Sequence, residues 1–318
     1  MAKWLQRELE MPYFNASGET YIDIPRGAKP REVTDLLVKN GILHSRIPFI
    51  VYLRTANLGR QIQAGEYRFS NPATPEQVAR RLIRGDVYFR SVTVPEGLTA
   101  GETIELLAKN GLGKPAEFHK ALLQTNWIVD IYPKARTLEG FLFPETYRFG
   151  RKDDPEKIIR AMVNQFRSKL ARILEQTPQS SGLSVSKAII LASMIEKEVK
   201  KPEERPLVAS VYINRLKMGM PLACDSTIIY ALKSAGVYNG NIRKADLAME
   251  SPYNSYLHPD LPPGPIANPG AASLRAALNP ANTDYLYYVS RNDGTHQFSK
   301  NYQSHLGAVA RYQKSRHR

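Results

Sequence analysis

Two glutamates near the end of an apolar segment are the side chains in this sequence best suited to acid–base chemistry. They are Glu196 and Glu198 in "AIILASMIEKEVKKPEERP" (188–206), and Pro202 must end a helix that carries them. At about 100° per residue, Glu198 falls on the main apolar stripe of that helix. Glu196 falls on another face, four residues before Lys200, which is the spacing of a solvated surface pair. Helix geometry therefore assigns Glu196 to the surface, where its replacement should be nearly silent.

The position of Glu198 favours the carboxylic acid over the carboxylate. The negative end of the helix dipole and burial among apolar side chains both penalise the charged form. A glutamic acid that stays protonated near neutral pH can protonate a glycosidic oxygen as a general acid. The same position also permits a structural ion pair with Arg205 or Arg215, and helix geometry does not choose between the two interpretations.

A Pro-rich segment supplies candidate binding residues. Residues 251–270, "SPYNSYLHPDLPPGPIANPG", contain six prolines, which exclude a regular helix or a central strand. Long irregular segments inside compact domains are usually functional, and a rigid backbone lowers the ordering cost of binding. Flat aromatic rings and amide donors suit a sugar chain, and a self-packed surface loop is the alternative. The polar candidates are Ser251, Tyr253, Asn254, Tyr256 and Asn268.

The elements before residue 165 form an internal repeat. The stretch "IDIPRGAKPREVTDLLVKNGIL" (22–43) aligns without a gap to "VTVPEGLTAGETIELLAKNGLG" (92–113), and residues 66–83 align with 146–163. Each copy predicts a strand, a helix ended by glycine, a second short strand, and a helix with Pro in its first turn. We interpret each copy as a strand–helix–helix–strand module with a trailing helix. Such modules are more often binding or spacing elements than catalysts.

One carboxylate in the second copy is not explained by the repeat. Glu145 lies in "EGFLFPETYRF", where the first copy has Gly65. The module itself therefore does not need an acid at this position. Glu145 is the candidate second carboxylate if the chemistry requires two.

Composition limits the partner and the compartment. The 44 Lys and Arg against 30 Asp and Glu give a formal charge of +14, which favours an anionic partner. No arginine-rich block is interleaved with aromatic residues, and zinc-finger and RNP motifs are missing, so nucleic acid is disfavoured. The longest apolar run is far shorter than a membrane span, and the N-terminal segment is charged where a signal peptide would be apolar. The sequence therefore predicts a cytoplasmic chain, or one whose upstream anchor has been removed.

Other chemistries lack their motifs. The histidines form no HExxH or close pair, and neither GxSxG nor a phosphate-binding loop occurs. The single cysteine, Cys224, cannot form an internal disulfide and has no obvious base beside it. We therefore expect no metal and no cofactor.

Four ordered motifs extend over much of the chain. They are "EGFLFPETYRF", "LASMIEKEVKKPEERPLVASVYINRLKMGMPL", "DSTIIYAL" and "SPYNSYLHPDLPPGPIANPGAASLRAAL". Together they closely resemble the endolytic murein transglycosylases, the YceG-like or MltG family, and the similarity runs from about 20 to 310. In that family the second glutamate of a Glu-Lys-Glu pattern is the catalytic acid, which implies Glu198. With the motifs we predict substrate-binding roles for Glu145, Asn214, Asp225 and Thr227, in addition to the polar residues of 251–270.

The resemblance also implies a domain organisation within an α+β fold. The family's N-terminal part contains a LysM-like domain, which fits the repeated module, and it usually follows a single transmembrane anchor. We expect a membrane-proximal stalk (1–19) whose anchor is absent, a LysM-like module (20–90), a second repeat-related module (91–165) and a catalytic domain (166–318). The expected location is a bacterial inner membrane, single-pass, with this region periplasmic. Expected partners are peptidoglycan glycan strands and peptidoglycan synthases.

One motif departs from the family pattern. Where the family commonly has Leu-Gln-Ser/Thr-Asp-Pro-Thr, this chain has "LACDST", with changes at Ala223, Cys224 and Ser226. Asp225 and Thr227 are kept. A substrate contact of the family's glutamine is therefore in doubt here, whereas the catalytic acid is not affected.

The implied reaction is cleavage of the β-1,4 bond between N-acetylmuramic acid and N-acetylglucosamine inside a glycan strand, without water, which would terminate nascent strands. The muramyl 6-hydroxyl is the nucleophile, so Glu198 acts first as acid and then as base and leaves a 1,6-anhydro end. Ordinary glycoside hydrolysis instead needs two carboxylates. The alternatives are a hydrolytic muramidase that uses Glu198 and Glu145, and a non-catalytic wall-binding scaffold.

Overall fold

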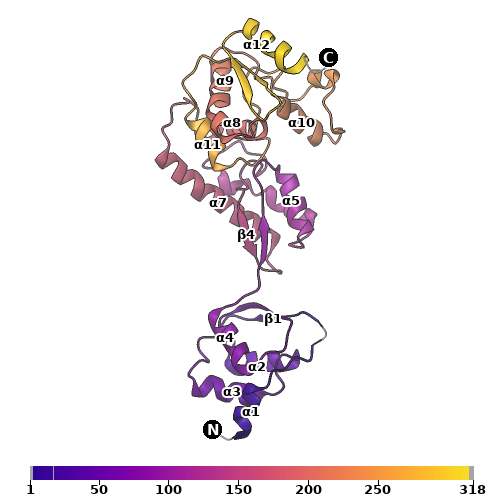
Figure 1. Ribbon diagram of the computed structural model, residues 1–318, viewed down its shortest axis with the longest axis vertical. Coiled ribbons are helices and arrows are strands. Elements are labelled where there is room, and N and C mark those ends of the chain that lie inside the picture. The colour runs from indigo at the N-terminus through magenta and orange to yellow at the C-terminus, as the bar shows by residue number, and fades with distance from the viewer. Residues whose placement is uncertain (1–2, 17, 315–318) are drawn as a thin grey trace. The chain divides into compact units, whose positions relative to one another are not determined.

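The protein has two compact units. The computed structural model describes residues 3–16 and 18–314 (Figure 1). The first unit comprises Met1–Arg90 and Arg148–Arg151, and the second comprises Ser91–Tyr147 and Lys152–Arg318. Helices and small antiparallel sheets occur in both, so the α+β class predicted from the sequence is confirmed. No helix of the described residues is both long enough and apolar enough to cross a membrane.

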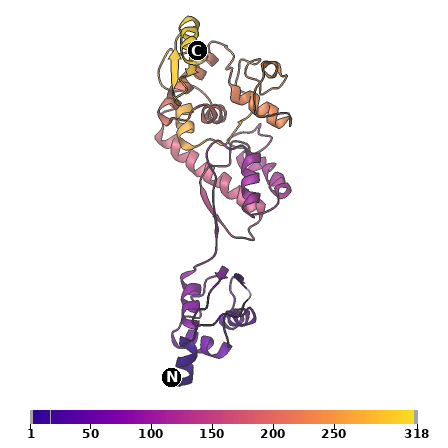
Figure 2. The same ribbon diagram turned by 45° about the vertical axis from the view of Figure 1, so that its right-hand side comes forward.

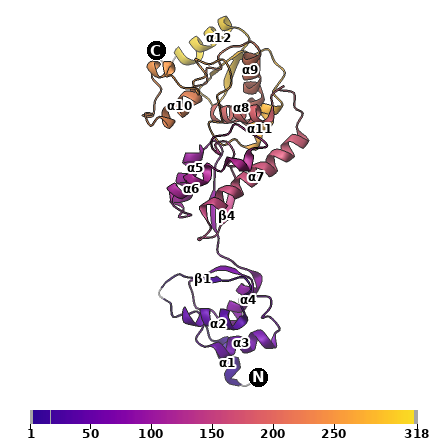
Figure 3. The same cartoon turned by 180° about the vertical axis from the view of Figure 1, so that it is seen from behind.

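The first unit has the predicted strand–helix–helix–strand order. Strands β1 and β2 pair antiparallel, with Thr20 opposite Phe69 and Ile24 opposite Gly65. Figures 1 and 3 show α2 and α3 side by side beneath this pair. The core between helices and strands includes Leu37, Phe49 and Tyr67, all fully buried. The elements are α1 (Lys3–Glu10), β1 (Thr20–Ile24), α2 (Pro30–Lys39), α3 (Arg46–Thr55), β2 (Gly65–Phe69) and α4 (Pro75–Arg84).

The repeat continues in the same element order at the start of the second unit. Strand β3 pairs with β4, as β1 pairs with β2. Thr74 before α4 and Thr99 before α5 both accept a hydrogen bond from the third helical residue, which stabilises each helix start. The elements are β3 (Arg90–Thr93), α5 (Ala100–Lys109), α6 (Pro115–Leu122), η1 (Thr125–Ile128), β4 (Thr146–Phe149) and α7 (Pro155–Gln176).

Helix α7 changes the expected domain boundary. The sequence analysis separates 91–165 from 166–318, but α7 runs without interruption across residue 165. Its apolar face buries Met162 and Phe166 on either side of that point, and the helix packs on both α6 and α11. Residues 91–165 therefore fold within the same compact unit as the region that carries Glu198.

Helix α8 lies at the centre of the second unit. It packs against α9, α10 and α11, and a short hairpin of β5 and β6 completes this part of the unit (Figure 1). Residues 251–270 contain neither helix nor strand, as the prolines predict. The elements are α8 (Val185–Glu198), η2 (Pro202–Glu204), α9 (Arg205–Lys217), α10 (Asp225–Ser234), η3 (Lys244–Ala248), α11 (Ala271–Leu278), β5 (Tyr287–Ser290), β6 (His296–Ser299), α12 (Tyr302–Val309) and η4 (Ala310–Lys314).

Glu139 is a buried acid in the second unit. Its Oε1 accepts a hydrogen bond at 2.8 Å from the backbone N–H of Ala100, in the first turn of α5. Burial raises the pKa of Glu139 from 4.5 to about 8 and outweighs the backbone N–H groups of Ala100 and Gly140, which lower it. The carboxyl is therefore neutral near pH 7.

Glu139→Gln should change the pH dependence of stability. The folded protein keeps the Glu139 proton up to about pH 8, whereas the unfolded chain releases it near 4.5, so wild-type stability should fall as pH rises through this interval. The glutamine amide does not ionise, so the melting temperature of the variant should fall less between about pH 5 and about pH 8.5. Glu175→Gln, at an exposed acid of α7, is the control. Parallel pH profiles for Glu139→Gln and wild type would contradict the prediction.

Candidate active site

Helix α8 brings Glu198 to its own last position. The helix begins after Ser184, whose Oγ accepts a hydrogen bond from the backbone N–H of Lys187. All eight residues from Ala188 to Ile195 are buried. Val199 then takes an extended conformation with φ −113° and ψ 118° and ends the helix. The Glu198 side chain therefore leaves the helix where the buried segment ends.

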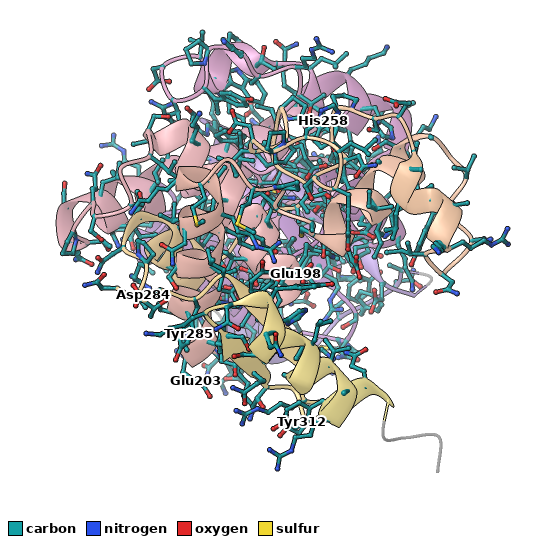
Figure 4. The ribbon with its side chains drawn as sticks, turned by 90° about the horizontal axis from the view of Figure 1, so that it is seen from above. Glu198, Glu203, His258, Asp284, Tyr285 and Tyr312 are labelled. Atoms are coloured by element: carbon teal, nitrogen blue, oxygen red, sulfur yellow. The ribbon has the colours of Figure 1, made fainter. Side chains whose placement is uncertain are left out.

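Three neutral donors converge on the Glu198 carboxylate. Ser226 Oγ donates to Oε1 at 2.6 Å, and Cys224 Sγ donates to the same oxygen at 3.3 Å. Tyr288 OH donates to Oε2 at 3.1 Å. Figure 2 shows α10, which carries Ser226, on one side of α8 and the hairpin that carries Tyr288 on the other. In Figure 4 Glu198 lies towards the middle of the view, whereas Glu203 and Tyr312 lie nearer its edge.

The donors keep their own protons. Burial, followed by the nearby Glu198 charge, raises the pKa of the Cys224 thiol well above its usual value of 9.0. Burial and Glu198 raise the pKa of Tyr288 well above 10.0 in the same way. Tyr212 OH lies 2.7 Å from Tyr288 OH and donates to it, because Tyr288 gives its own proton to Glu198. Cys224 is therefore a thiol donor and not a thiolate nucleophile.

Glu198 forms no ion pair within the described part of the chain, so the structural alternative from the sequence analysis is not observed. Arg205 pairs with Glu196 instead, and Arg215 donates to main-chain oxygens, including that of Leu286 at 2.7 Å. Neutral donors stabilise the ionised carboxylate, whereas the C-terminal end of the helix disfavours it. The carboxyl is therefore held in place without a permanent counter-charge.

The surface assignment of Glu196 is wrong. Its side chain is 4% exposed and accepts a hydrogen bond at 2.9 Å from Arg205, in the first turn of α9. Its other oxygen accepts a hydrogen bond at 2.9 Å from the N–H of Gly270, the residue that caps α11. The helical-wheel argument assumes a solvent face, but α8 is buried all round from Ala188 to Ile195. Glu196 therefore joins α8, α9 and α11 and does not pair with Lys200.

Asp225 and Tyr256 lie beside Glu198. Asp225 is exposed and directly precedes Ser226 in the first turn of α10. Tyr256 donates a short hydrogen bond to Asp225 Oδ1. Burial, this hydrogen bond and the charge of Glu198 all raise the pKa of Tyr256, so its hydroxyl stays protonated. These are the two predicted binding residues that the structure brings to the candidate acid.

Several other predicted binding residues use their polar side-chain atoms in hydrogen bonds within the protein. The Asn254 amide donates to the carbonyls of residues 247 and 249, and the Asn268 amide donates to that of residue 98. Both side chains are fully buried, so a scaffold role replaces the expected sugar contact. The remaining three also bond internally: Thr227 to the Cys224 carbonyl, Asn214 to the Thr283 and Tyr285 carbonyls, and Ser251 to the Tyr253 N–H.

The last two predicted binding residues, Glu145 and Tyr253, lie elsewhere in the second unit. Glu145 accepts from Gln165 and pairs with Lys169 at 3.2 Å, both on α7, and the Lys169 hydrogen bond lowers its pKa. No hydrogen bond or salt bridge described for Glu145 involves a side chain around Glu198. Tyr253 packs near Tyr230 in a separate cavity. No three His, Cys, Asp or Glu side chains gather as metal ligands within the described ranges.

Sequence reasoning missed the donors around Glu198. Cys224 and Ser226 occur in "LACDST" at positions that differ from the family pattern, and both face the acid. Tyr288 lies in the tyrosine-rich strand "DYLYYVS", which the sequence marks only as a strand. The departures in the motif were the available signal, because two of the three changed positions, Cys224 and Ser226, carry a potential donor.

The fold and the site together define a class of protein. An α+β unit buries one helix up to Glu198, and among the residues that the structure describes only hydroxyl and thiol groups donate hydrogen bonds to its carboxyl. Such a group can give up a proton and regain it. The class is therefore a protein with a general acid–base site centred on one glutamate.

Comparisons with known proteins agree with this class. The chain is 32% identical over 307 residues to the endolytic murein transglycosylase of Bacillus subtilis, covering 92% of this chain and 84% of that protein. It is 28% identical over 335 residues to the endolytic murein transglycosylase of Streptococcus pneumoniae R6, covering 95% of this chain and 60% of that one. The crystal structure of a YceG-like protein from Listeria monocytogenes matches with a TM-score of 0.61 at 29% identity, covering 92% of this chain and 100% of that one. The model of the YceG-like family matches residues 22–311, and the chain belongs to that family.

Glu196→Gln should strongly destabilise the protein. The change removes the closer carboxylate partner of Arg205, whose side chain is 8% exposed, and leaves only Glu96 at 3.5 Å as its counter-charge. The free energy of unfolding in urea should fall by about 2 kcal/mol, less than for a buried charge left with no partner. Glu203→Gln, at an exposed acid, is the matched control and should change it by less than about 0.5 kcal/mol. Equal stability of the two variants would contradict the structural role of Glu196.

Proposed function

We propose that this protein is an endolytic murein transglycosylase, a lyase that cleaves the β-1,4 bond between N-acetylmuramic acid and N-acetylglucosamine within glycan strands. The observation that carries the proposal is the environment of Glu198. Its hydrogen-bond partners among the described residues are a hydroxyl, a phenol and a thiol, with no second carboxyl. The relatives that bear this name, at 28–32% identity over most of the chain, support the same activity.

In the proposed mechanism Glu198 acts twice. As the acid, it gives its proton to the glycosidic oxygen while the bond from that oxygen to the muramyl C1 breaks. The muramyl 6-hydroxyl then bonds to C1 and passes its proton to the Glu198 carboxylate, which restores the acid. The strand gains a 1,6-anhydro end, and no water is consumed. Ser226, Cys224 and Tyr288 stabilise the carboxylate between the two proton transfers.

Hydrolysis by a pair of carboxylates is less well supported. An inverting or retaining hydrolase holds its second carboxylate across the scissile bond from the first. Glu145, the candidate for that role, is engaged with Lys169 and Gln165. Asp225 and Tyr256, which hydrogen-bond to each other, also lie beside Glu198, and we assign them to substrate binding.

The cellular setting is part of the proposal and depends on the family resemblance. We infer a LysM-like role for the first unit, whose strand–helix–helix–strand order is compatible with it. We also infer attachment to the inner membrane, with the two units on the extracytoplasmic side. Peptidoglycan synthases are the inferred partners, and termination of nascent strands is the inferred role. The charge of +14 suits an acidic polymer.

Glu198→Gln should abolish cleavage while glycan binding is retained. Loss of a general acid lowers rates by about 10²–10⁴-fold, and glutamine keeps the shape of the side chain. Release of soluble fragments measures cleavage, and co-sedimentation with insoluble murein measures binding. Glu203→Gln, which exchanges an exposed acid for its amide, should cleave at the wild-type rate. Cleavage by Glu198→Gln within a few-fold of wild type would favour the non-catalytic scaffold.

Ser226→Ala should slow cleavage without abolishing it. The Ser226 hydroxyl donates to Glu198 Oε1 at 2.6 Å, and its loss removes one hydrogen bond that stabilises the carboxylate between the two proton transfers. A hydrogen bond to a charged group contributes about 1.5–3 kcal/mol, so kcat for the release of soluble fragments should fall by on the order of 10–100-fold. Ser304→Ala, at an exposed serine of α12, is the control and should keep the wild-type kcat. A wild-type kcat in Ser226→Ala would contradict the role of this hydroxyl.

A further inference from the structure

A cavity of about 820 Å³ lies along α8, away from the donors of Glu198. Its walls come from the loop at 132–139, the first turns of α8, Tyr230 of α10 and part of the Pro-rich segment. Ile190 lines the cavity, and Glu198 lies eight residues further along the same helix, about 12 Å at 1.5 Å per residue. Ser226, Cys224 and Tyr288 are not among its lining residues. The cavity is therefore a separate site on the helix that carries the acid.

The cavity carries an excess of positive charge. Lys134, Arg136 and Lys187 line it, against Asp260 and the buried Glu139. Lys187 lies 3.8 Å from Asp260, so these two charges offset each other. Lys134 and Arg136 are exposed, and neither forms a salt bridge within the part of the chain that the structure describes. The N-terminal turn of α8 adds the positive end of a helix dipole.

The interior of the cavity is aromatic and does not cancel this charge. The rings of Tyr230 and Tyr253 lie 4.9 Å apart between centroids, at an angle of 47°. Glu139 borders them, and because burial raises its pKa to about 8, it is uncharged near pH 7. Pro262 and Pro263 make the adjoining wall stiff. The cavity thus offers flat faces for apolar groups beneath two free cations.

We propose that this cavity binds the acidic peptide branch of murein while the glycan of the same strand lies at Glu198. The inference rests on the proposed function and adds a second binding site to it. Arg136 and Lys134 hold the peptide's carboxylates, because a guanidinium and an ammonium both form charge-assisted hydrogen bonds with them. The tyrosine rings pack against the peptide's aliphatic parts. Uncharged sugar rings alone would leave both cations without a partner.

The selectivity between two forms of one substrate tests the inference. Murein strands with intact peptides are compared with the same strands after an amidase has removed the peptides, and kcat/KM is measured on each. The wild-type protein should prefer the peptide-bearing strands by on the order of tenfold, the effect of about 1.4 kcal/mol of binding free energy. The double variant Lys134→Ala/Arg136→Ala should lose this preference, through a higher KM on peptide-bearing strands.

A charge-matched control separates the cavity from the overall charge. Lys217→Ala/Lys244→Ala also removes two exposed cations of the second unit, neither of which lines the cavity, and should keep the preference. Equal cleavage of both strands by wild type, or an unchanged preference in Lys134→Ala/Arg136→Ala, would overturn the inference and leave the proposed function standing. A wild-type protein that cleaves neither kind of strand would contradict the proposed function, and the inference would fall with it.

Discussion

The burial of α8 is the constraint on which the rest of the site depends. Ala188 to Ile195 are all buried, and the side chain of Glu196, which follows them, is only 4% exposed. The carboxylate of Glu196 is therefore neutralised inside the protein by Arg205 and by the N–H of Gly270. Because these partners begin α9 and cap α11, one side chain fixes the end of α8 against two other helices. These interactions of Glu196 therefore fix the position of Glu198, two residues further on.

The contrast between the two glutamates explains how one helix end provides both stability and chemistry. Glu196 has a cationic partner, Arg205, which suits a structural role. The donors to Glu198 in the described part of the chain are all neutral, and burial keeps the Cys224 and Tyr288 protons in place. These donors can stabilise a carboxylate, but they do not neutralise it as an arginine would. Such an environment suits a carboxyl that must exist in both protonation states during one reaction cycle.

Local patterns in the sequence predict much of this fold. The repeated strand–helix–helix–strand order depends on Pro and Gly positions and on apolar spacing, and both copies form as expected. Local patterns likewise predict the end of α8 to within a few residues of Glu198. The domain boundary near residue 165 could not be predicted from local patterns. It depends on α7, which continues through that point and packs on α11.

The surroundings of the two glutamates could not be predicted from local patterns. Tyr288 is 90 residues from Glu198 along the chain, and Gly270 is 74 residues from Glu196. A helical wheel shows which residues share a face, but it does not show whether that face meets water or another helix. The same limit applies to Asn254 and Asn268, whose amides look available in the sequence and are consumed by backbone carbonyls in the fold.

The source of the oxygen at the new strand end tests the single-carboxyl mechanism most directly. Murein is digested by the wild-type protein in water enriched in oxygen-18, and the ends are analysed by mass spectrometry. Attack by the muramyl 6-hydroxyl predicts 1,6-anhydro ends that contain no oxygen-18. Reducing muramyl ends that carry one oxygen-18 atom would show that water is the nucleophile and would contradict the mechanism.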